Sequence, residues 1–188
     1  INVSLYATLP PGQCEYILKD SEAKIFFVST GIQLKKAVQV FDACKDLKQI
    51  IAFDEPKVQK YIEKDYVKLF DTVCAAGSKA EPQHSGELKK RIKGTSPEDI
   101  ATLIYTSGTT GQPKGAMLTH RNIVSNVKAA HDAISIDDSD RCLSFLPLCH
   151  SFERTGGYYA MMAGGAEIYY AESVDTVARN MLEAHPTI

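Results

Sequence analysis

The sequence lacks the features that mark several large classes of protein. It has no run of 18 apolar residues, so we expect no transmembrane helix. Its 21 Lys and Arg residues are offset by 23 Asp and Glu residues, and the net charge of −2 gives no electrostatic case for nucleic-acid binding. The five cysteines are odd in number and include no Cys-x-x-Cys pair, which argues against a disulfide framework or a zinc ribbon. We expect reduced, mostly buried thiols in a cytoplasmic protein.

The ends of the chain also lack the signals of a complete protein. The sequence begins at Ile1 inside an apolar run, without an initiator Met or a signal peptide, and stops at Ile188 where another strand is expected. We therefore expect a piece of a longer protein. With 188 residues and 44% hydrophobic content, this piece is large enough for one domain with a sizeable core.

Short apolar runs alternate with helical patterns along most of the chain. Strands are expected at 3–6, 24–29, 49–53, 100–106, 116–118, 142–146 and 166–170. Helices between them carry apolar residues at spacings of three and four, which predicts one buried face each. Such inward sets are Cys14, Ile17 and Leu18; Leu34, Ala37, Val38 and Phe41; Ile123, Val127, Ala130 and Ile134; and Val174, Val177, Met181 and Leu182. The alternation predicts an α/β fold, a doubly wound and mostly parallel sheet with helices on both faces, forming a single subdomain over residues 1–188.

Residues 54–99 have a weaker pattern, with many Lys and Glu residues and one short apolar segment at 67–73. The Lys89-Lys90-Arg91 cluster is interpreted as the solvated face of a short helix, and a phosphate contact is the alternative. Thr119 and Ser173 are expected to cap the helices that follow them.

Residues 105–115 have the composition of a phosphate-binding loop. The stretch reads Tyr-Thr-Ser-Gly-Thr-Thr-Gly-Gln-Pro-Lys-Gly and directly follows an apolar run. Glycines let the backbone approach a ligand closely, and N–H and hydroxyl groups donate to phosphate oxygens. Lys114 adds a flexible positive charge. The spacing fits neither the Walker A loop nor the dinucleotide Gly-x-Gly-x-x-Gly pattern. The alternative is a polar turn between two strands.

A second segment, 146–154, follows the expected strand at 142–146. Open α/β sheets place ligands beyond the ends of their strands, which makes His150 a candidate site residue. Taken alone, a histidine at such a place is more often structural. Four residues of the next helix, with core packing as the alternative, are candidates for lining an acyl tunnel: Tyr158, Tyr159, Met161 and Met162.

The 105–115 stretch resembles the signature loop of the adenylate-forming (AMP-binding) superfamily, which includes acyl-CoA synthetases, luciferases and peptide-synthetase adenylation domains. The sequence Pro-Leu-x-His-x-Phe-Glu-Arg at 147–154 resembles the long-chain fatty acyl-CoA synthetase branch in particular. The resemblance implies a piece of the N-terminal domain of an ATP-dependent fatty acid–CoA ligase. Such an enzyme forms an acyl-adenylate from a fatty acid and Mg-ATP, and CoA then displaces AMP.

The resemblance also implies roles for individual residues. Lys114 would offset charge on pyrophosphate, His150 would orient the acyl carboxylate or the phosphate, and Thr106 would in addition reach Mg²⁺. The phosphate contacts implied by the resemblance are Thr106, Ser107, Gly108, Thr109, Thr110, Gly111 and Lys114. The family's Tyr-Gly-x-Thr-Glu segment and its C-terminal lysine have no counterpart here, so we expect this piece alone to be inactive.

Two other functions stay open at this point. One is another adenylate-forming enzyme, such as an aryl-CoA ligase or a peptide-synthetase adenylation domain, against which the Ser-Phe-Glu-Arg sequence after His150 speaks. The other is a nucleotide-binding module without catalytic activity. Peripheral membrane contact of the whole protein, the acyl chain length and the oligomeric state are also left open.

Overall fold

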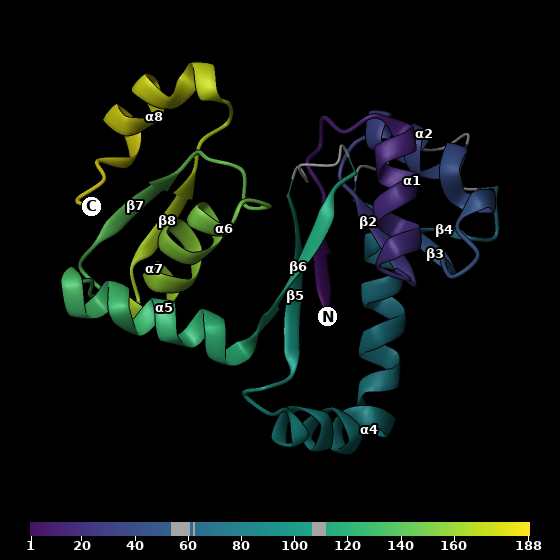
Figure 1. The fold of residues 1–188 in the computed structure, drawn as a ribbon, viewed down its shortest axis with the longest axis horizontal. Coiled ribbons are helices and arrows are strands. Elements are labelled where there is room, and N and C mark those ends of the chain that lie inside the picture. The colour runs from purple at the N-terminus through teal and green to yellow at the C-terminus, as the bar shows by residue number, and fades with distance from the viewer. Residues whose placement is uncertain (54–60, 62, 107–111) are drawn as a thin grey trace. The chain divides into compact units, whose positions relative to one another are not determined.

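The computed structural model describes residues 1–53, 61, 63–106 and 112–188 (Figure 1). The chain divides into two compact units. Unit 1 combines Ile1–Tyr6 with Ser96–Ile188, and unit 2 is Ala7–Thr95. Within the described ranges no helix combines the length and apolar character needed to cross a membrane.

Unit 2 is a small α/β unit around one parallel sheet. Its elements in chain order are α1 (Pro11–Asp20), β2 (Ile25–Val28), α2 (Gly31–Val40), the 3-10 helix η1 (Phe41–Ala43), β3 (Gln49–Ala52), β4 (Val67–Leu69) and α4 (Phe70–Gly94). The strand order is β2-β3-β4, and both pairings are parallel. Thr30 starts α2 with a capping box, because its hydroxyl accepts from the Gln33 N–H.

The core of unit 2 confirms the predicted inward faces of its first two helices. Cys14, Ile17 and Leu18 of α1 are all buried, and Leu34 and Ala37 of α2 have no exposed surface. Leu18, Leu34 and Ala37 pack with buried side chains of the sheet and of the segment between η1 and β3. The buried cluster consists of Leu18, Val28, Leu34, Ala37, Val40, Cys44, Leu47, Ile50, Ala52 and Val67. All of its members belong to unit 2.

The helix α4 is longer than the sequence analysis expected. It runs for 25 residues, through Pro82, and none of its residues is buried. Its sequence holds three Ala and four Lys residues, which are strong helix formers, although three Gly residues and Pro82 disfavour a helix. Arg91 forms an ion pair with Glu87 one turn earlier, with 2.8 Å between Nε and Oε1. The Lys89–Arg91 cluster is exposed, as its first interpretation held, but the short helix was wrong.

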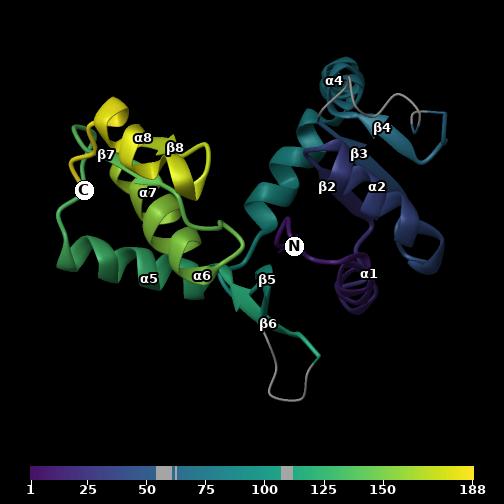
Figure 2. The ribbon, with the colours of Figure 1, turned by 90° about the horizontal axis from the view of Figure 1, so that it is seen from above.

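Unit 1 contains two further sheets and the helices that follow residue 119 (Figure 2). Its elements in chain order are β1 (Asn2–Ser4), β5 (Ile100–Thr106), β6 (Lys114–Thr119), α5 (His120–Ala133), β7 (Arg141–Ser144), α6 (Ser151–Glu153), the π-helical turn η2 (Arg154–Ala160), α7 (Met161–Gly164), β8 (Glu167–Tyr170), the 3-10 helix η3 (Val174–Thr176) and α8 (Val177–Ala184). One sheet has the order β1-β5-β6, and the other pairs β7 with β8. Figure 2 shows α5 beside the helical run that contains α6 and α7.

The α/β class with mostly parallel pairing is confirmed, but the described strands form three sheets where one was expected. Four of the five strand pairings are parallel, and β5 with β6 is antiparallel. The connection between β5 and β6 explains this exception. It has only seven residues, whereas a parallel crossover needs about a dozen or more.

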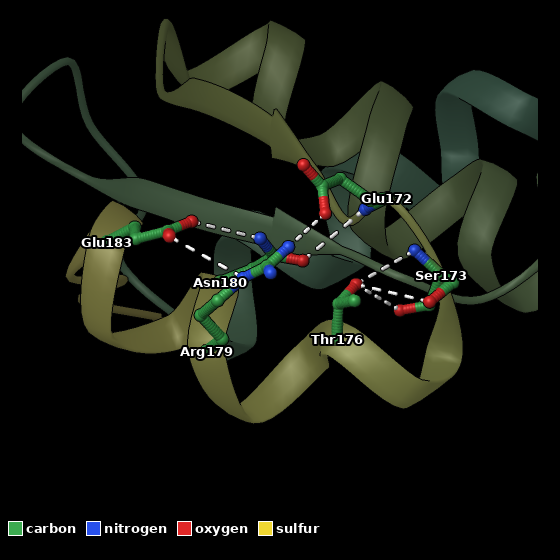
Figure 3. Close-up of polar contacts among 6 residues, drawn as sticks. All are labelled: Glu172, Ser173, Thr176, Arg179, Asn180 and Glu183. Atoms are coloured by element: carbon green, nitrogen blue, oxygen red, sulfur yellow. Dashed lines mark hydrogen bonds and ion pairs between the residues drawn. The ribbon is translucent and has the colours of Figure 1, made fainter.

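The predicted caps of unit 1 are found, whereas its two predicted inward helix faces differ in burial. The Thr119 hydroxyl accepts from the Asn122 N–H at the start of α5. Ser173 precedes η3, and its N–H donates to Thr176 Oγ1 at 3.0 Å (Figure 3). In α5 the predicted residues Ile123, Val127 and Ala130 are half-buried, and Ala130 packs against the small core of unit 1, whereas Ile134 is 54% exposed. In α8 only Asn180 and Ala184 are buried.

The apolar residues predicted to face inward from α8 are instead largely exposed, Leu182 at 75% and Met181 at 50%. Periodicity identifies the residues that share a helix face, but it does not show whether a neighbour covers that face. The ion pairs of α8 are exposed too, since Arg179 pairs with Glu172 and Glu183 (Figure 3).

Candidate functional site

The two ends of the connection between β5 and β6 lie opposite each other. Thr106 and Lys114 are Cα partners in the antiparallel register, so their side chains lie on the same face of the hairpin. Both residues are exposed. A hydroxyl and an ammonium group therefore flank the connection at its base, where both can donate to the oxygens of one anion. The remaining predicted loop residues lie outside the described residues: Ser107, Gly108, Thr109, Thr110 and Gly111.

The face of β5 that carries Thr106 is buried along most of its length. Because side chains alternate along a strand, Thr102, Ile104 and Thr106 share one face. Thr102 is 2% exposed and Ile104 is 6% exposed, whereas Thr106 is open to solvent. This face therefore becomes accessible only where the strand reaches the loop.

The glycine that closes the motif has a steric reason within the hairpin. Gly115 is the Cα partner of Tyr105. A Cβ added at Gly115 would lie 3.0 Å from the Tyr105 ring, which is closer than side chains normally approach. The ring of the first motif residue thus lies against the last glycine, and this contact fixes the shape of the hairpin just below the loop.

His150 lies at the start of the helical run that begins with α6, and it is exposed. Its Nδ1 accepts from the Phe152 N–H at 3.3 Å. When Nδ1 is an acceptor, the neutral ring carries its proton on Nε2. His150 can therefore present an N–H donor to an oxygen of a ligand while its other nitrogen stays bound to the helix.

The residue before His150 is held by the segment that follows β1. The Cys149 thiol shares a hydrogen bond with the Tyr6 hydroxyl. Burial raises the pKa of Cys149, and this outweighs the lowering effects of that hydrogen bond and of the nearby Arg154 charge. The thiol therefore stays protonated at neutral pH and is a structural contact, since the thiolate is the nucleophilic form.

The residue pair Glu153 and Arg154 lies one helical turn beyond His150. Glu153 is 6% exposed, and its Oε1 accepts from the Ser144 hydroxyl at 2.5 Å, at the end of β7. Gly157 makes room for this carboxylate, because an added Cβ there would lie 2.5 Å from Glu153 Oε1. The π-helical turn η2 begins directly after Glu153.

Arg154 points to the other sheet of unit 1. Its Nη1 donates to Thr102 Oγ1 at 2.7 Å, and its Nη2 donates to Asn2 Oδ1 at 3.0 Å and to the Ser4 hydroxyl. Asn2 and Ser4 belong to β1, and Thr102 belongs to β5. The structure thus links the His150 segment to the strand that ends in the phosphate-loop motif.

The four residues considered for an acyl tunnel have different environments. Met161 is 8% exposed and packs in a small core with Ile136, Cys142 and Ala160. Met162 is 56% exposed. The rings of Tyr158 and Tyr159 are half-buried and lie 5.2 Å apart. Met161 therefore follows the core-packing alternative, and the tunnel stays a prediction for the others. Gly165 ends α7 with a φ of 82°, as expected of a helix C-terminus.

A metal site of acidic and histidine ligands is not formed by the part of the chain that the structure describes. It contains no group of three or more His, Cys, Asp or Glu residues that could hold a metal ion. A hydroxyl such as that of Thr106 can contribute one oxygen ligand to a hard cation such as Mg²⁺, which commonly keeps waters and substrate phosphates as its other ligands.

The sequence that forms the hairpin and the His150 segment matches that of a known protein family. A family model described as "AMP-binding enzyme" matches residues 1–188. The chain belongs to the AMP-binding enzyme family. This membership confirms the resemblance seen in the 105–115 stretch, and it covers both units of the chain.

Two relatives of this AMP-binding chain carry the names of fatty acyl-CoA synthetases or ligases. It is 32% identical over 190 residues to fatty acyl-CoA synthetase B of Dictyostelium discoideum, covering 99% of this chain and 27% of that protein. It is 33% identical over 196 residues to long-chain-fatty-acid–CoA ligase ACSBG2 of Xenopus laevis, covering 98% of this chain and 25% of that protein. The chain thus spans about a quarter of the length of these relatives.

A solved structure also matches the fold. The anthranilate CoA ligase AuaEII, in complex with anthranoyl-AMP, superimposes with a TM-score of 0.72 at 23% identity, covering 98% of this chain and 33% of that chain. At this identity the likeness shows the fold. It agrees with the α/β class predicted from the sequence.

Glu153 and Arg154 entered the sequence analysis only as part of the 147–154 motif, and neither of them was assigned a role. Two adjacent charges are usually read as an exposed helix face. The signal that could have revealed them is their position, because they interrupt an otherwise apolar and small-residue helix between 152 and 163. Charges in such a helix need partners when they are buried.

Proposed function

We propose that the protein carrying this chain is an ATP-dependent long-chain fatty acid–CoA ligase. In its first step a fatty carboxylate attacks the α-phosphate of ATP, which gives an acyl-adenylate and pyrophosphate. In its second step the thiol of CoA attacks the acyl carbon and AMP leaves. The observation that carries the proposal is the hairpin base, where Thr106 and Lys114 flank the 107–113 connection on one face.

The chemistry of these residues suits the first step. A carboxylate is already a nucleophile, so catalysis rests on positioning and on stabilising charge rather than on a general base. Lys114 would offset negative charge on the departing pyrophosphate. The hydroxyls of Ser107, Thr109 and Thr110 and the backbone of Gly108 and Gly111 would hold the β- and γ-phosphates. These five roles rest on the sequence motif.

His150 would act at the other reacting group. Its Nε2–H can donate to an oxygen of the acyl carboxylate or of the α-phosphate, because Nδ1 is bound to the Phe152 N–H. Mg²⁺ would neutralise charge on the triphosphate, and Thr106 would provide one of its oxygen contacts. Anthranoyl-AMP in the matching ligase structure is an acyl-adenylate, which supports the same class of intermediate here.

Two classes of carboxylic acid are candidates for the substrate. The names of both relatives support a fatty acid, and that of the Xenopus laevis relative a long-chain one, whereas the solved structure with the same fold carries an aromatic acid. An aryl-CoA ligase is therefore the second candidate.

We also propose that both units are parts of one N-terminal AMP-binding domain. We further propose that the protein is cytoplasmic, in keeping with the free thiols of Cys14, Cys44 and Cys142.

An acid-dependent ATP–pyrophosphate exchange assay on the full-length protein tests the function. Exchange should depend on the added acid and should be fastest with long-chain fatty acids. Faster exchange with aromatic acids or amino acids would replace the fatty acid with the second candidate. Nucleotide binding without exchange for any acid would leave a module without catalytic activity.

A further inference from the structure

We propose that Arg154 is a positioning residue for adenylation, which fixes His150 relative to the strand that leads into the phosphate loop. This inference rests on the proposed function and adds a residue to it. Arg154 itself is not placed against a reacting atom. Its effect would pass through His150, which lies one turn earlier in the same helical run.

His150 and Arg154 are one helical turn apart. The Arg154 N–H donates to the His150 carbonyl at 3.1 Å, so the two residues are joined by one turn of helix backbone. A turn of helix is stiff because its dihedral angles are fixed by such bonds. Wherever the guanidinium of Arg154 is held, the backbone of His150 is held about one turn away.

The side chain of Arg154 is held by several hydrogen bonds. Its planar guanidinium donates to oxygens on two adjacent strands, Thr102 on β5 and both Asn2 and Ser4 on β1. Several donors in a rigid fork fix direction as well as distance, which an ammonium group does less well. Thr102 is itself held, since its hydroxyl donates to the Asn2 carbonyl at 2.9 Å.

The partner of Arg154 on β5 lies on the strand face that leads to the phosphate loop. Thr102 and Thr106 lie on the same face of the strand, because they are four residues apart. At about 3.3 Å per residue, the hydroxyl that Arg154 binds lies about 13 Å along the strand from the loop base. Arg154 thus ties the His150 helix to the face that presents Thr106 and Lys114.

The neighbour of Arg154 completes the anchor. Glu153 binds the Ser144 hydroxyl at the end of β7, whereas Arg154 binds β1 and β5. Two consecutive side chains therefore fasten one turn of helix to two different sheets of unit 1. Tyr6 adds a third link, through its hydrogen bond to the Cys149 thiol next to His150. His150 is exposed, yet both of its flanks are fastened.

The experiment compares Arg154→Gln with a matched loss of charge elsewhere, in the full-length protein. The control is Arg179→Gln, which removes an exposed arginine paired with Glu172 and Glu183 in the same unit (Figure 3). Arg154→Gln should slow adenylation by about 10²-fold, since a misplacement of about 1 Å at a reacting group can have that effect. Arg179→Gln should leave the rate within about 2-fold.

A double-mutant cycle separates positioning from general damage. If Arg154 acts through His150, the variant with both His150→Ala and Arg154→Gln should be no slower than the slower single variant. Independent roles would multiply to a loss of about 10⁴-fold and would overturn the proposal. Thioester formation from added acyl-adenylate should stay within a few-fold of the wild type. An equal loss in both half-reactions would indicate a merely structural role.

A second measurement does not depend on the reaction. In the full-length protein, hydrogen exchange of the backbone at 146–153 should be faster in Arg154→Gln than in the wild type or in Arg179→Gln. Unchanged hydrogen exchange at 146–153 would contradict the anchoring, even if the wild-type protein catalysed no ATP–pyrophosphate exchange with any acid. Failure of the proposed function and failure of this inference are therefore distinguishable.

Discussion

At the scale of single residues, Lys114 is the described side chain with the most direct proposed role in charge stabilisation. It is exposed, and its place opposite Thr106 directs it to the same face of the hairpin. Loss of one donor that stabilises charge in a transition state typically slows a reaction by 10²-fold or more. Lys114→Ala in the full-length protein should therefore slow ATP–pyrophosphate exchange by at least about 10²-fold.

The matched control for this change is Lys128→Ala, which removes an exposed lysine from α5 in the same unit. It should leave the exchange rate unchanged, because a solvated charge on a helix surface contributes little. An exchange rate for Lys114→Ala equal to that of Lys128→Ala would remove Lys114 from the proposed mechanism.

The buried cysteines give a second prediction at this scale, on pH dependence. Burial raises the pKa of the Cys14 and Cys44 thiols. An unfolded thiol ionises near pH 8.5, so above that pH the unfolded state loses protons that the folded state keeps. Stability from these thiols is fully present below about pH 8 and is lost as the pH rises through the raised values. The urea midpoint of the 188-residue chain should fall between about pH 8 and 10.

Replacing one of these thiols should make the fall less steep. Cys44→Ala removes a buried thiol, whereas Cys74→Ala removes an exposed one from α4 and serves as the control. Urea titrations at several pH values should show a shallower slope for Cys44→Ala only. Equal slopes in all three proteins would show that ionisation of this thiol does not contribute.

At the scale of elements, the helical run from α6 to α7 depends on one of its two adjacent glycines. A Cβ on Gly157 would lie 2.5 Å from Glu153 Oε1 and 2.7 Å from its Cδ, whereas a Cβ on Gly156 would meet nothing within 4 Å. Gly157→Ala should destabilise the chain by about 1–3 kcal/mol, as overpacking usually does. Gly156→Ala should be neutral or stabilising by up to about 1 kcal/mol.

Urea unfolding of the two alanine variants measures this difference directly, because they change neighbouring residues in the same helix. The full-length Gly157→Ala variant should also adenylate more slowly, since the Glu153 link to Ser144 would be displaced. Equal stability of the two variants would mean that η2 adapts without cost.

The elements also show why sequence reasoning succeeds in some places and not in others. The inward face of α1 was predicted residue by residue, because apolar spacing and burial coincide when a helix packs on a sheet. The length of α4 was missed because Pro82 is usually taken as a helix end. The partners of Glu153 and Arg154 lie 9 and 52 residues away or farther, and no local pattern encodes such contacts.

For the site, the sequence supplied the residue types and the fold supplied their placement. The motif at 105–115 was sufficient to predict the family, which the match over residues 1–188 confirms. That Thr106 and Lys114 face each other follows from the antiparallel register, and apolar runs do not specify whether neighbouring strands are parallel. The division into three sheets was missed because apolar runs do not specify which strands pair with one another.

At the scale of the whole molecule, the two units have cores of different size. Among the residues that the structure describes, the buried cluster of unit 2 has ten members, whereas that of unit 1 has four: Ile136, Cys142, Ala160 and Met161. Each cluster draws all of its residues from its own unit. Burial of apolar surface is the main source of stability, so unit 2 should unfold at a higher urea concentration than unit 1.

Hydrogen exchange of the 188-residue chain in increasing urea tests this order. Amides of β2, β3 and α2 should stay protected after those of β7 and β8 have exchanged. Two isoleucine variants make the test specific, because Ile50 belongs to the core of unit 2 and Ile136 to that of unit 1. Each Ile→Ala change should cost about 2–5 kcal/mol and lower the opening midpoint of its own unit only. A common midpoint for both units, shifted equally by either variant, would show that the chain unfolds as one cooperative body.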